Sequence, residues 1–369
     1  MAKVEKQLKG YLAPSAPLNF RLCDGTEKGL RLVVGFTTKW FHHRVGVDFG
    51  EKYHKDPYFR FKEIQKMRAY LLKTFPSVPC FSEMSEVDEC ATISGVYGVC
   101  PVAMAYGMKP TYQAHDWPAM HSREQLELEE ILELEPIKVA NTAVGEDLLR
   151  QIEIIGKEWG KCDGYLNYQG PLGNAFKLMG EATLLNMLVE PEDMDRVFAH
   201  VTDTTIDMIR TVEEAQRATG FPSVDEGLFA CVSDCITNMI SPELYEEQLL
   251  VYDRKFADTM KYTGVHTCNW VVDRIAPKLA MIDRVGYVDF SVHSDLEVVG
   301  ACFPEARKLA FFSPEDFVGV DDDKLTAVLT DVADRFGDCD ICLADLDLNT
   351  PDEEIIRFSA LVDKVNERR

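Results

Sequence analysis

From about residue 143 onward, the hydrophobic positions alternate between two patterns along the chain. Short continuous apolar runs, typical of strands buried on both faces, alternate with longer segments whose apolar residues recur every three or four positions, typical of helices. The predicted strands cover residues 31–36, 164–168, a stretch preceding Asp225, a stretch around His266, 287–292, 309–312 and 339–343. The predicted helices cover residues 57–75, 124–135, 147–160, 182–188, 191–219, 242–262, 276–279, 296–302, 324–336 and 351–366.

This alternation, without hairpins, is typical of parallel strands joined by crossover helices. At 369 residues it favours an α/β fold of the (β/α)8 TIM barrel type over an open sheet. We predict a single domain in which residues 1–60, rich in turn formers and aromatics, form an N-terminal extension and residues 61–369 form the barrel. No G-x-G-x-x-G motif follows a predicted strand, which argues against a dinucleotide-binding fold.

Charge and composition limit the kinds of partner and compartment that we expect for this protein. A formal net charge of −23 argues against nucleic acid and anionic membrane surfaces, because both are bound by basic surfaces. No apolar stretch approaches the roughly 20 residues that span a bilayer. The first six residues lack the apolar core of a secretory signal, so we expect a cytoplasmic protein whose 11 cysteines are thiols or metal ligands. Whether the chain forms a homodimer is left open.

One short segment carries the most specific chemistry. Residues 264–271 read GVHTCNWV, which places His266 two positions before Cys268. In an extended segment these two side chains point to the same face, so an imidazole and a thiol would lie side by side at a strand end. Zinc favours that mixture of nitrogen and sulfur ligands. The alternative is a histidine bonded to a carbonyl beside a buried thiol.

Three segments together resemble the uroporphyrinogen decarboxylase superfamily. They are QGPLGNAF at residues 169–176, ISPELYEE at 240–247, and the HTC of 266–268 with DLNTP at 347–351. The resemblance extends over roughly residues 140–369. It implies a (β/α)8 barrel whose site lies at the C-terminal ends of the strands. The superfamily includes corrinoid-dependent methyltransferases as well as the decarboxylase of the haem pathway.

Within that superfamily, the residues favour the methyltransferase branch. The H-x-C pair is carried by its zinc methyltransferases, whereas the arginine-rich R-Q-A-G-R segment of the decarboxylase has no counterpart in FTTKWFHHR at residues 36–44. Segments VGVDFGEKYH at 45–54 and ISGVYG at 93–98 are similar to the subset linked to O-demethylation of methoxylated aromatic compounds.

The resemblance therefore implies a zinc enzyme that moves a methyl group from a methoxylated aromatic compound to the cob(I)alamin of a partner protein. The corrinoid would be carried by that separate protein, because this chain shows no cobalamin-binding D-x-H-x-x-G segment. Three alternatives stay open. They are a coenzyme M-type methylcobamide:thiol methyltransferase, a metal-free decarboxylase, and a barrel that binds a partner without catalysing a reaction.

The third zinc ligand is where this chain departs from the resemblance. The resemblance places a cysteine after the last strand, where this chain has Leu346. Cys342 lies four residues before Leu346, so its side chain would point to the same face of the strand. At about 3.3 Å per residue, it would lie some 13 Å deeper than Leu346 unless the strand bulges. We take Cys342 as the third ligand after His266 and Cys268. Asp345 and His293 are alternative donors.

Further site residues are expected at strand ends and in the N-terminal part. His293 and Asp225 are candidate catalytic, proton-handling groups beside the metal ligands. Candidate cofactor-binding residues, with a role in the hydrophobic core as the alternative for each aromatic, are Trp40, Tyr97, Asn167 and Tyr168.

Overall fold

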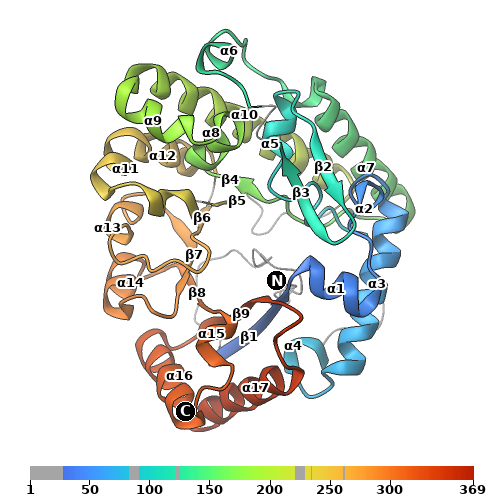
Figure 1. Cartoon of the computed structure of the whole chain (residues 1–369), viewed down its shortest axis with the longest axis vertical. Coiled ribbons are helices and arrows are strands. Elements are labelled where there is room, and N and C mark those ends of the chain that lie inside the picture. The colour runs from blue at the N-terminus through green and yellow to red at the C-terminus, as the bar shows by residue number, and fades with distance from the viewer. Residues whose placement is uncertain (1–27, 83–90, 122–124, 221–228, 234, 261) are drawn as a thin grey trace.

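The main sheet has seven parallel strands in the order β1-β9-β8-β7-β6-β5-β4 (Figure 1). It is seen in a computed structural model that describes residues 28–82, 91–121, 125–220, 229–233, 235–260 and 262–369. The candidate catalytic Asp225 and the strand predicted to precede it lie outside these ranges. The strands are β1 (Leu30–Phe36), β4 (Tyr168–Gln169), β5 (Phe229–Ser233), β6 (Tyr262–His266), β7 (Val285–Ser291), β8 (Arg307–Phe312) and β9 (Cys339–Leu346).

Helices surround the strands in the view of Figure 1. In the N-terminal half they are α1 (Thr38–Val45), α2 (Glu51–Lys55), α3 (Pro57–Thr74), α4 (Pro79–Ser82), α5 (Pro101–Ala105), α6 (Leu128–Leu132), α7 (Ala143–Trp159), α8 (Pro171–Met179) and α9 (Ala182–Val189). In the C-terminal half they are α10 (Pro191–Ala218), α11 (Pro242–Gln248), α12 (Leu250–Thr259), α13 (Ala276–Leu279), α14 (Leu296–Cys302), α15 (Pro314–Phe317), α16 (Asp322–Phe336) and α17 (Asp352–Glu367). In the described ranges, no helix combines the length and apolar character that crossing a membrane requires.

The edge of the sheet at β4 continues toward an eighth segment. Thr92 forms a parallel bridge with Asp163, five positions before β4, and the Ile93 amide donates to the Asp163 carbonyl at 3.0 Å. In the described part of the chain, backbone pairing does not join this edge to β1 on the opposite side. The parallel α/β sheet is therefore as expected, and the closed eight-stranded barrel stays a prediction.

The N-terminal part is more regular than its turn-rich sequence suggested. Strand β1 lies inside the segment predicted as an extension, yet it pairs in parallel with β9 in the main sheet. A hairpin of β2 (Pro110–Gln113) and β3 (Asp116–Met120) was not predicted, and it lies beside α1. The acidic segment 124–135 contributes only the short helix α6 among its described residues.

Capping chemistry explains where helix α11 begins. The Ser241 side chain accepts a hydrogen bond from the Leu244 amide at 3.1 Å and Pro242 is the first residue of α11, which confirms the predicted start. The helix predicted to continue to residue 262 is instead two helices, α11 and α12. They are separated at Leu249, whose φ of −119° departs from helical values.

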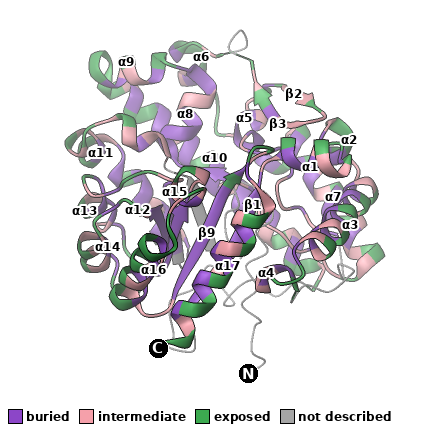
Figure 2. Cartoon of the chain, turned by 60° about the horizontal axis from the view of Figure 1, so that its bottom comes forward, coloured by how far each residue is buried: buried purple, intermediate pink, exposed green. Residues whose placement is uncertain are grey.

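The two faces of the sheet bury different side chains. The face toward the helices belongs to a large core that includes Val34, Phe290 and Leu343. The residues that alternate with these along β1, β7, β8 and β9 point to the other face, where they form a smaller cluster. Its buried members are Val33, Tyr287, Leu309, Phe311, Cys342 and Ala344. Strand β9 is buried along most of its length (Figure 2).

Candidate metal centre

Three potential metal ligands meet at the carboxyl ends of two neighbouring strands. Cys235 lies just beyond β5, His266 is the last residue of β6, and Cys268 follows two positions later. Strands β5 and β6 are parallel and Ser233 pairs with His266, so both strands end at the same level. One ligand atom from each residue lies within 4.8 Å of the other two. Such a set of two sulfurs and one nitrogen suits zinc.

The distances within this cluster are short. The Cys235 and Cys268 Sγ atoms are 2.7 Å apart, and Cys268 Sγ lies 3.2 Å from His266 Nε2. A tetrahedral zinc ion holds two thiolate sulfurs about 3.8 Å apart, given a Zn–S distance of about 2.3 Å. Metal binding would therefore separate the two sulfurs by roughly 1 Å.

A local turn, rather than an extended strand, brings Cys268 to the cluster. The prediction placed His266 and Cys268 on one face of a strand, but β6 ends at His266. Cys268 has a φ of +58°, the left-handed conformation that residues other than glycine rarely adopt. Strain of this kind persists where the surrounding structure imposes it, and it gathers at functional sites.

A buried carboxylate orients the histidine. Asp289 on β7 is fully buried, and its Oδ2 accepts from His266 Nδ1 at 2.5 Å and from the Tyr287 hydroxyl at 2.8 Å. Its Oδ1 accepts from the Thr267 amide at 2.7 Å. With Nδ1 carrying the proton, the lone pair of His266 Nε2 faces the thiols, as in carboxylate–histidine–zinc sites.

The charges of the cluster are strongly coupled. The hydrogen bond with Cys268 lowers the pKa of Cys235 to about 5, against the effect of burial. The same hydrogen bond and burial raise the pKa of Cys268. Burial opposes protonation of His266, but the Asp289 carboxylate and the Cys268 sulfur raise its pKa well above the usual value. One thiol thus ionises readily, and a cation is needed to hold both as thiolates.

The structure does not bring Cys342 to this cluster. Cys342 is fully buried on β9, among the side chains of the smaller core with Val33 and Phe311. Cys235 supplies the second sulfur instead. The sequence signal for Cys235 was a cysteine directly after a strand, but the preceding strand was predicted before residue 225 rather than at 229–233.

The two alternative donors lie outside the three-residue cluster. Asp345 is at the end of β9, and its carboxyl interacts electrostatically with His266. Desolvation raises the pKa of Asp345, and His266 opposes that rise. His293 follows β7, and its exposed ring nitrogen Nε2 lies 2.6 Å from Asp316 Oδ1.

Two of the aromatic candidates have clear packing roles. Trp40 is fully buried and stacks on Phe36, with ring centroids 4.0 Å apart. Tyr97 is buried, and its hydroxyl donates to Asp147 while its amide donates to His54 Nδ1. A role in binding a cofactor stays a prediction for both residues.

The other two candidates lie at the start of β4. Tyr168 is buried, packs edge-on against Tyr165 with centroids 5.3 Å apart, and has its pKa raised by burial. The half-buried Asn167 accepts a hydrogen bond from Gln169 Nε2 at 3.2 Å. Their predicted contact with a cofactor is likewise untested.

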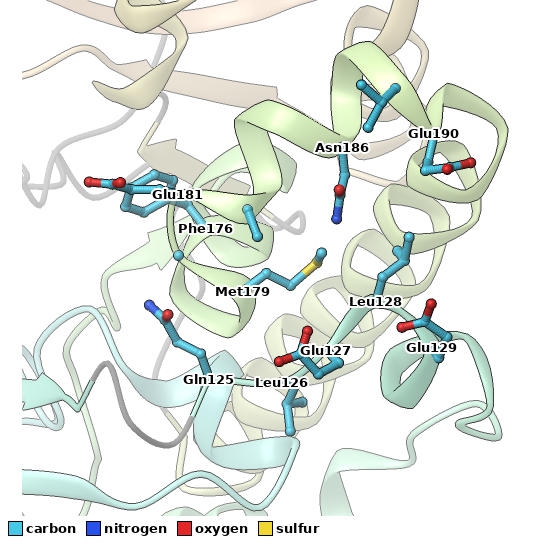
Figure 3. Close-up of a pocket in the computed structure, with 13 residues that line it drawn as sticks. Gln125, Leu126, Glu127, Leu128, Glu129, Phe176, Met179, Glu181, Asn186 and Glu190 are labelled. Atoms are coloured by element: carbon cyan, nitrogen blue, oxygen red, sulfur yellow. The ribbon is translucent and has the colours of Figure 1, made fainter.

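A cavity of about 800 Å³ lies away from these ligands, between the segment around α6 and helices α8 and α9 (Figure 3). Four glutamates, Glu127, Glu129, Glu181 and Glu190, are among its lining residues, together with apolar side chains such as Met179. The described residues of the lining include no histidine or cysteine, so they offer no ligand set like that of the metal centre.

Comparison with known proteins identifies the fold. No family model matches the chain, and no curated protein matches it. Among solved structures, a methyltransferase from Methanosarcina mazei is similar over 92% of this chain and 94% of its own, with a TM-score of 0.62 and 16% identity. A Listeria monocytogenes protein described as a vitamin-B12-independent methionine synthase covers 84% of this chain and 88% of its own, with a TM-score of 0.45 and 10% identity. The chain shares the fold of the Methanosarcina methyltransferase structure.

Proposed function

We propose that this protein is a zinc-dependent methyltransferase that moves a methyl group from a methoxylated aromatic compound to the cob(I)alamin of a separate corrinoid protein. The observation that carries the proposal is the cluster of Cys235, His266 and Cys268 at the carboxyl ends of parallel strands. The likeness to a methyltransferase structure supports methyl transfer as the reaction class. The sequence segments described above support the aryl ether and the corrinoid partner.

The donor set fits a catalytic zinc site. Two sulfurs and one imidazole nitrogen leave a fourth position for a substrate atom. When bound there, zinc supplies a Lewis acid that stabilises negative charge on the oxygen of the leaving phenolate. Phenolate is a poor leaving group, so this stabilisation would assist attack on the methyl carbon by the reduced cobalt of the partner.

The residues of the chain prepare this site before substrate arrives. Asp289 holds His266 in the tautomer that presents Nε2 to the metal. The hydrogen bond between Cys235 and Cys268 favours one ionised thiol in the pair, and both would bind a cation as thiolates.

A coenzyme M-type methyltransferase is the second candidate. The two cysteines favour it, because a zinc ion held by thiolates is suited to activate a thiol substrate by lowering its pKa. In that reaction the methyl group moves from the corrinoid to the thiol. Both candidates use the same three ligands and differ in the second substrate.

Metal analysis of the purified protein is the first test. We expect about one zinc per chain, and His266→Ala should lose it. The zinc protein is then mixed with a reduced corrinoid protein and 2-methoxyphenol while the cobalt absorption is followed. Formation of methyl-cobalt supports the proposal. Absence of zinc, or absence of methyl-cobalt with every aryl methyl ether tried, contradicts it, and demethylation of methyl-cobalt by a thiol favours the second candidate.

A further inference from the structure

Strand β9 carries a bulge just before it ends. Val34 of β1 pairs with Leu343, but Phe36 pairs with Leu346, so three steps on β9 oppose two on β1. The extra residue falls at Ala344 or Asp345, and Asp345 has a left-handed φ of +56°. Bulges re-aim side chains and are frequent next to active sites. The bulge thus comes directly before Leu346, the last residue of β9.

The bulge lies at the same end of the sheet as the metal centre, and it contains a carboxylate. Ala344, the neighbour of Asp345, belongs to the cluster on the face of the sheet away from the helices, and Phe311 of that cluster packs against the His266 ring. The Asp345 side chain is exposed, and its charge interacts with that of His266. Asp345 is not one of the three grouped residues, so its carboxylate adds a negative charge at the same end of the sheet rather than a fourth ligand.

Basic side chains are scarce where the strands end. Of the described residues in the three positions after each strand of the main sheet, Lys39 is the one lysine or arginine, and its side chain is exposed on α1. The same positions contain the acids Glu315 and Asp347. Sites that bind carboxylate or sulfonate groups normally use arginine or lysine for them.

We propose that Asp345 is a specificity-determining residue that admits neutral or cationic methyl donors to the metal centre and disfavours anionic ones such as methoxybenzoates. The inference rests on the proposed function, because it assumes that the substrate lies beside the metal. A fixed negative charge repels a second one most strongly in a partly desolvated mouth, where water screens poorly. The same repulsion would act on a thiol that carries a sulfonate, so it disfavours the coenzyme M-type acceptor.

Three matched donors test the inference by methyl-cobalt formation. They are 4-methoxybenzoate, 4-methoxybenzyl alcohol and 4-methoxybenzylamine, which differ in one charged or neutral group. We expect kcat/KM for the benzoate to be at least about tenfold below that for the alcohol, from one like-charge contact. Asp345→Asn should shrink this ratio to within about threefold, and Asp345→Lys should reverse it. Asparagine suits the left-handed position, so Asp345→Asn preserves the fold.

Two controls define the effect. Glu315→Gln removes an exposed negative charge on helix α15, at the same end of the sheet but outside the bulge, and it should leave the ratio unchanged. The zinc content should be the same in all variants. An Asp345→Asn protein with the wild-type ratio overturns the inference, and so does one that loses zinc, since Asp345 would then be a ligand.

A binding measurement separates this inference from the proposed function. In the Co²⁺-substituted protein, 4-mercaptobenzoate and 4-mercaptobenzyl alcohol are titrated while the cobalt absorption is followed, which needs no methyl transfer. The wild type should bind the benzoate at least about tenfold more weakly, and Asp345→Asn should bind both alike. That result without any turnover refutes the proposed reaction and leaves the role of Asp345 intact. Equal binding of both thiols by the wild type overturns the role of Asp345.

Discussion

At the scale of single residues, we expect substitutions of Cys235 and Cys342 to have opposite effects on zinc content. Cys235→Ala removes one of the two sulfurs of the cluster, so we expect the purified variant to contain little zinc. Cys342→Ala removes a buried thiol from the smaller core, and it should keep its zinc while losing about 1 kcal/mol of stability. Metal analysis together with urea unfolding separates the two effects. Zinc loss in Cys342→Ala with retention in Cys235→Ala would restore Cys342 as the ligand.

Asp289 gives a second prediction at this scale. Asp289→Asn keeps the shape of the side chain but removes the charge that fixes the His266 tautomer. We expect zinc affinity to fall by about 10- to 100-fold, as measured by competition with a chromogenic chelator. Tyr287→Phe is the matched control, because it removes one hydrogen bond to the same carboxylate and leaves the charge. An unchanged affinity in Asp289→Asn would show that His266 is oriented without it.

The sequence pointed to two of the three residues that the structure groups together. His266 and Cys268 were recognisable because they are close in the chain and their spacing is typical of metal ligands. Cys235 lies 31 positions before His266, and only the pairing of β5 with β6 brings it there. No strand was predicted at residues 229–233, so Cys235 was not recognised as a residue at a strand end. The bulge in β9 at residues 344–345 brings Cys342 only one position closer to the rim. Cys342 still pairs with Val33, three positions before Phe36 at the end of β1.

At the scale of elements, helix α12 contains a buried acid that should make stability depend on pH. The Asp253 carboxyl is buried and accepts one hydrogen bond from the Tyr245 hydroxyl at 2.7 Å. Burial raises its pKa to about 7, compared with about 3.9 in an unfolded chain. Between these pH values the unfolded chain releases this proton and the folded chain keeps it, so the contribution of Asp253 to stability falls as pH rises.

Asp253→Asn isolates that contribution. The variant cannot ionise at this position, so its stability relative to the wild type should rise between pH 5 and pH 8, by up to a few kcal/mol at about 1.4 kcal/mol per pKa unit. Urea unfolding at both pH values measures it, with Asp321→Asn at the exposed N-cap of α16 as the control, because asparagine caps a helix about as well as aspartate. A stability difference that is the same at both pH values would contradict the raised pKa.

The elements themselves were largely predictable where their pattern is long. Helices α10, α16 and α17 were predicted to within a few residues, because their amphipathic period repeats over several turns. The hairpin of β2 and β3 was missed because it is short and only partly buried. The break between α11 and α12 was missed because the apolar period runs through Leu249 without a glycine or proline.

At the scale of the whole molecule, the alternation of periods predicted a parallel sheet with helices around it, and the structure has both. Closure of the sheet depends on contacts between β1 and the segment near Thr92, which are far apart in sequence and carry no periodic signal. Charge gave a further expectation, that nucleic acid and anionic membranes are not partners, and this stays a prediction.

Metal removal should lower the stability of the whole fold. The cluster joins the end of β6 to the segment after β5, so a bound ion stabilises the folded chain over an unfolded one. At a free zinc concentration 100 times the Kd, mass action contributes about 2.7 kcal/mol. For 369 residues the entropy of unfolding is about 0.8 kcal/mol/K, so this contribution corresponds to a rise in Tm of roughly 3 °C to 4 °C.

Thermal unfolding with and without a chelator measures this shift. His266→Ala should have the same Tm under both conditions, because its cluster has lost the nitrogen ligand. Asp345→Asn should keep the full shift, since Asp345 lies outside the cluster. If the wild type also showed no shift, the three side chains would not form a zinc site. A shift that persisted in His266→Ala would point to metal bound elsewhere in the chain.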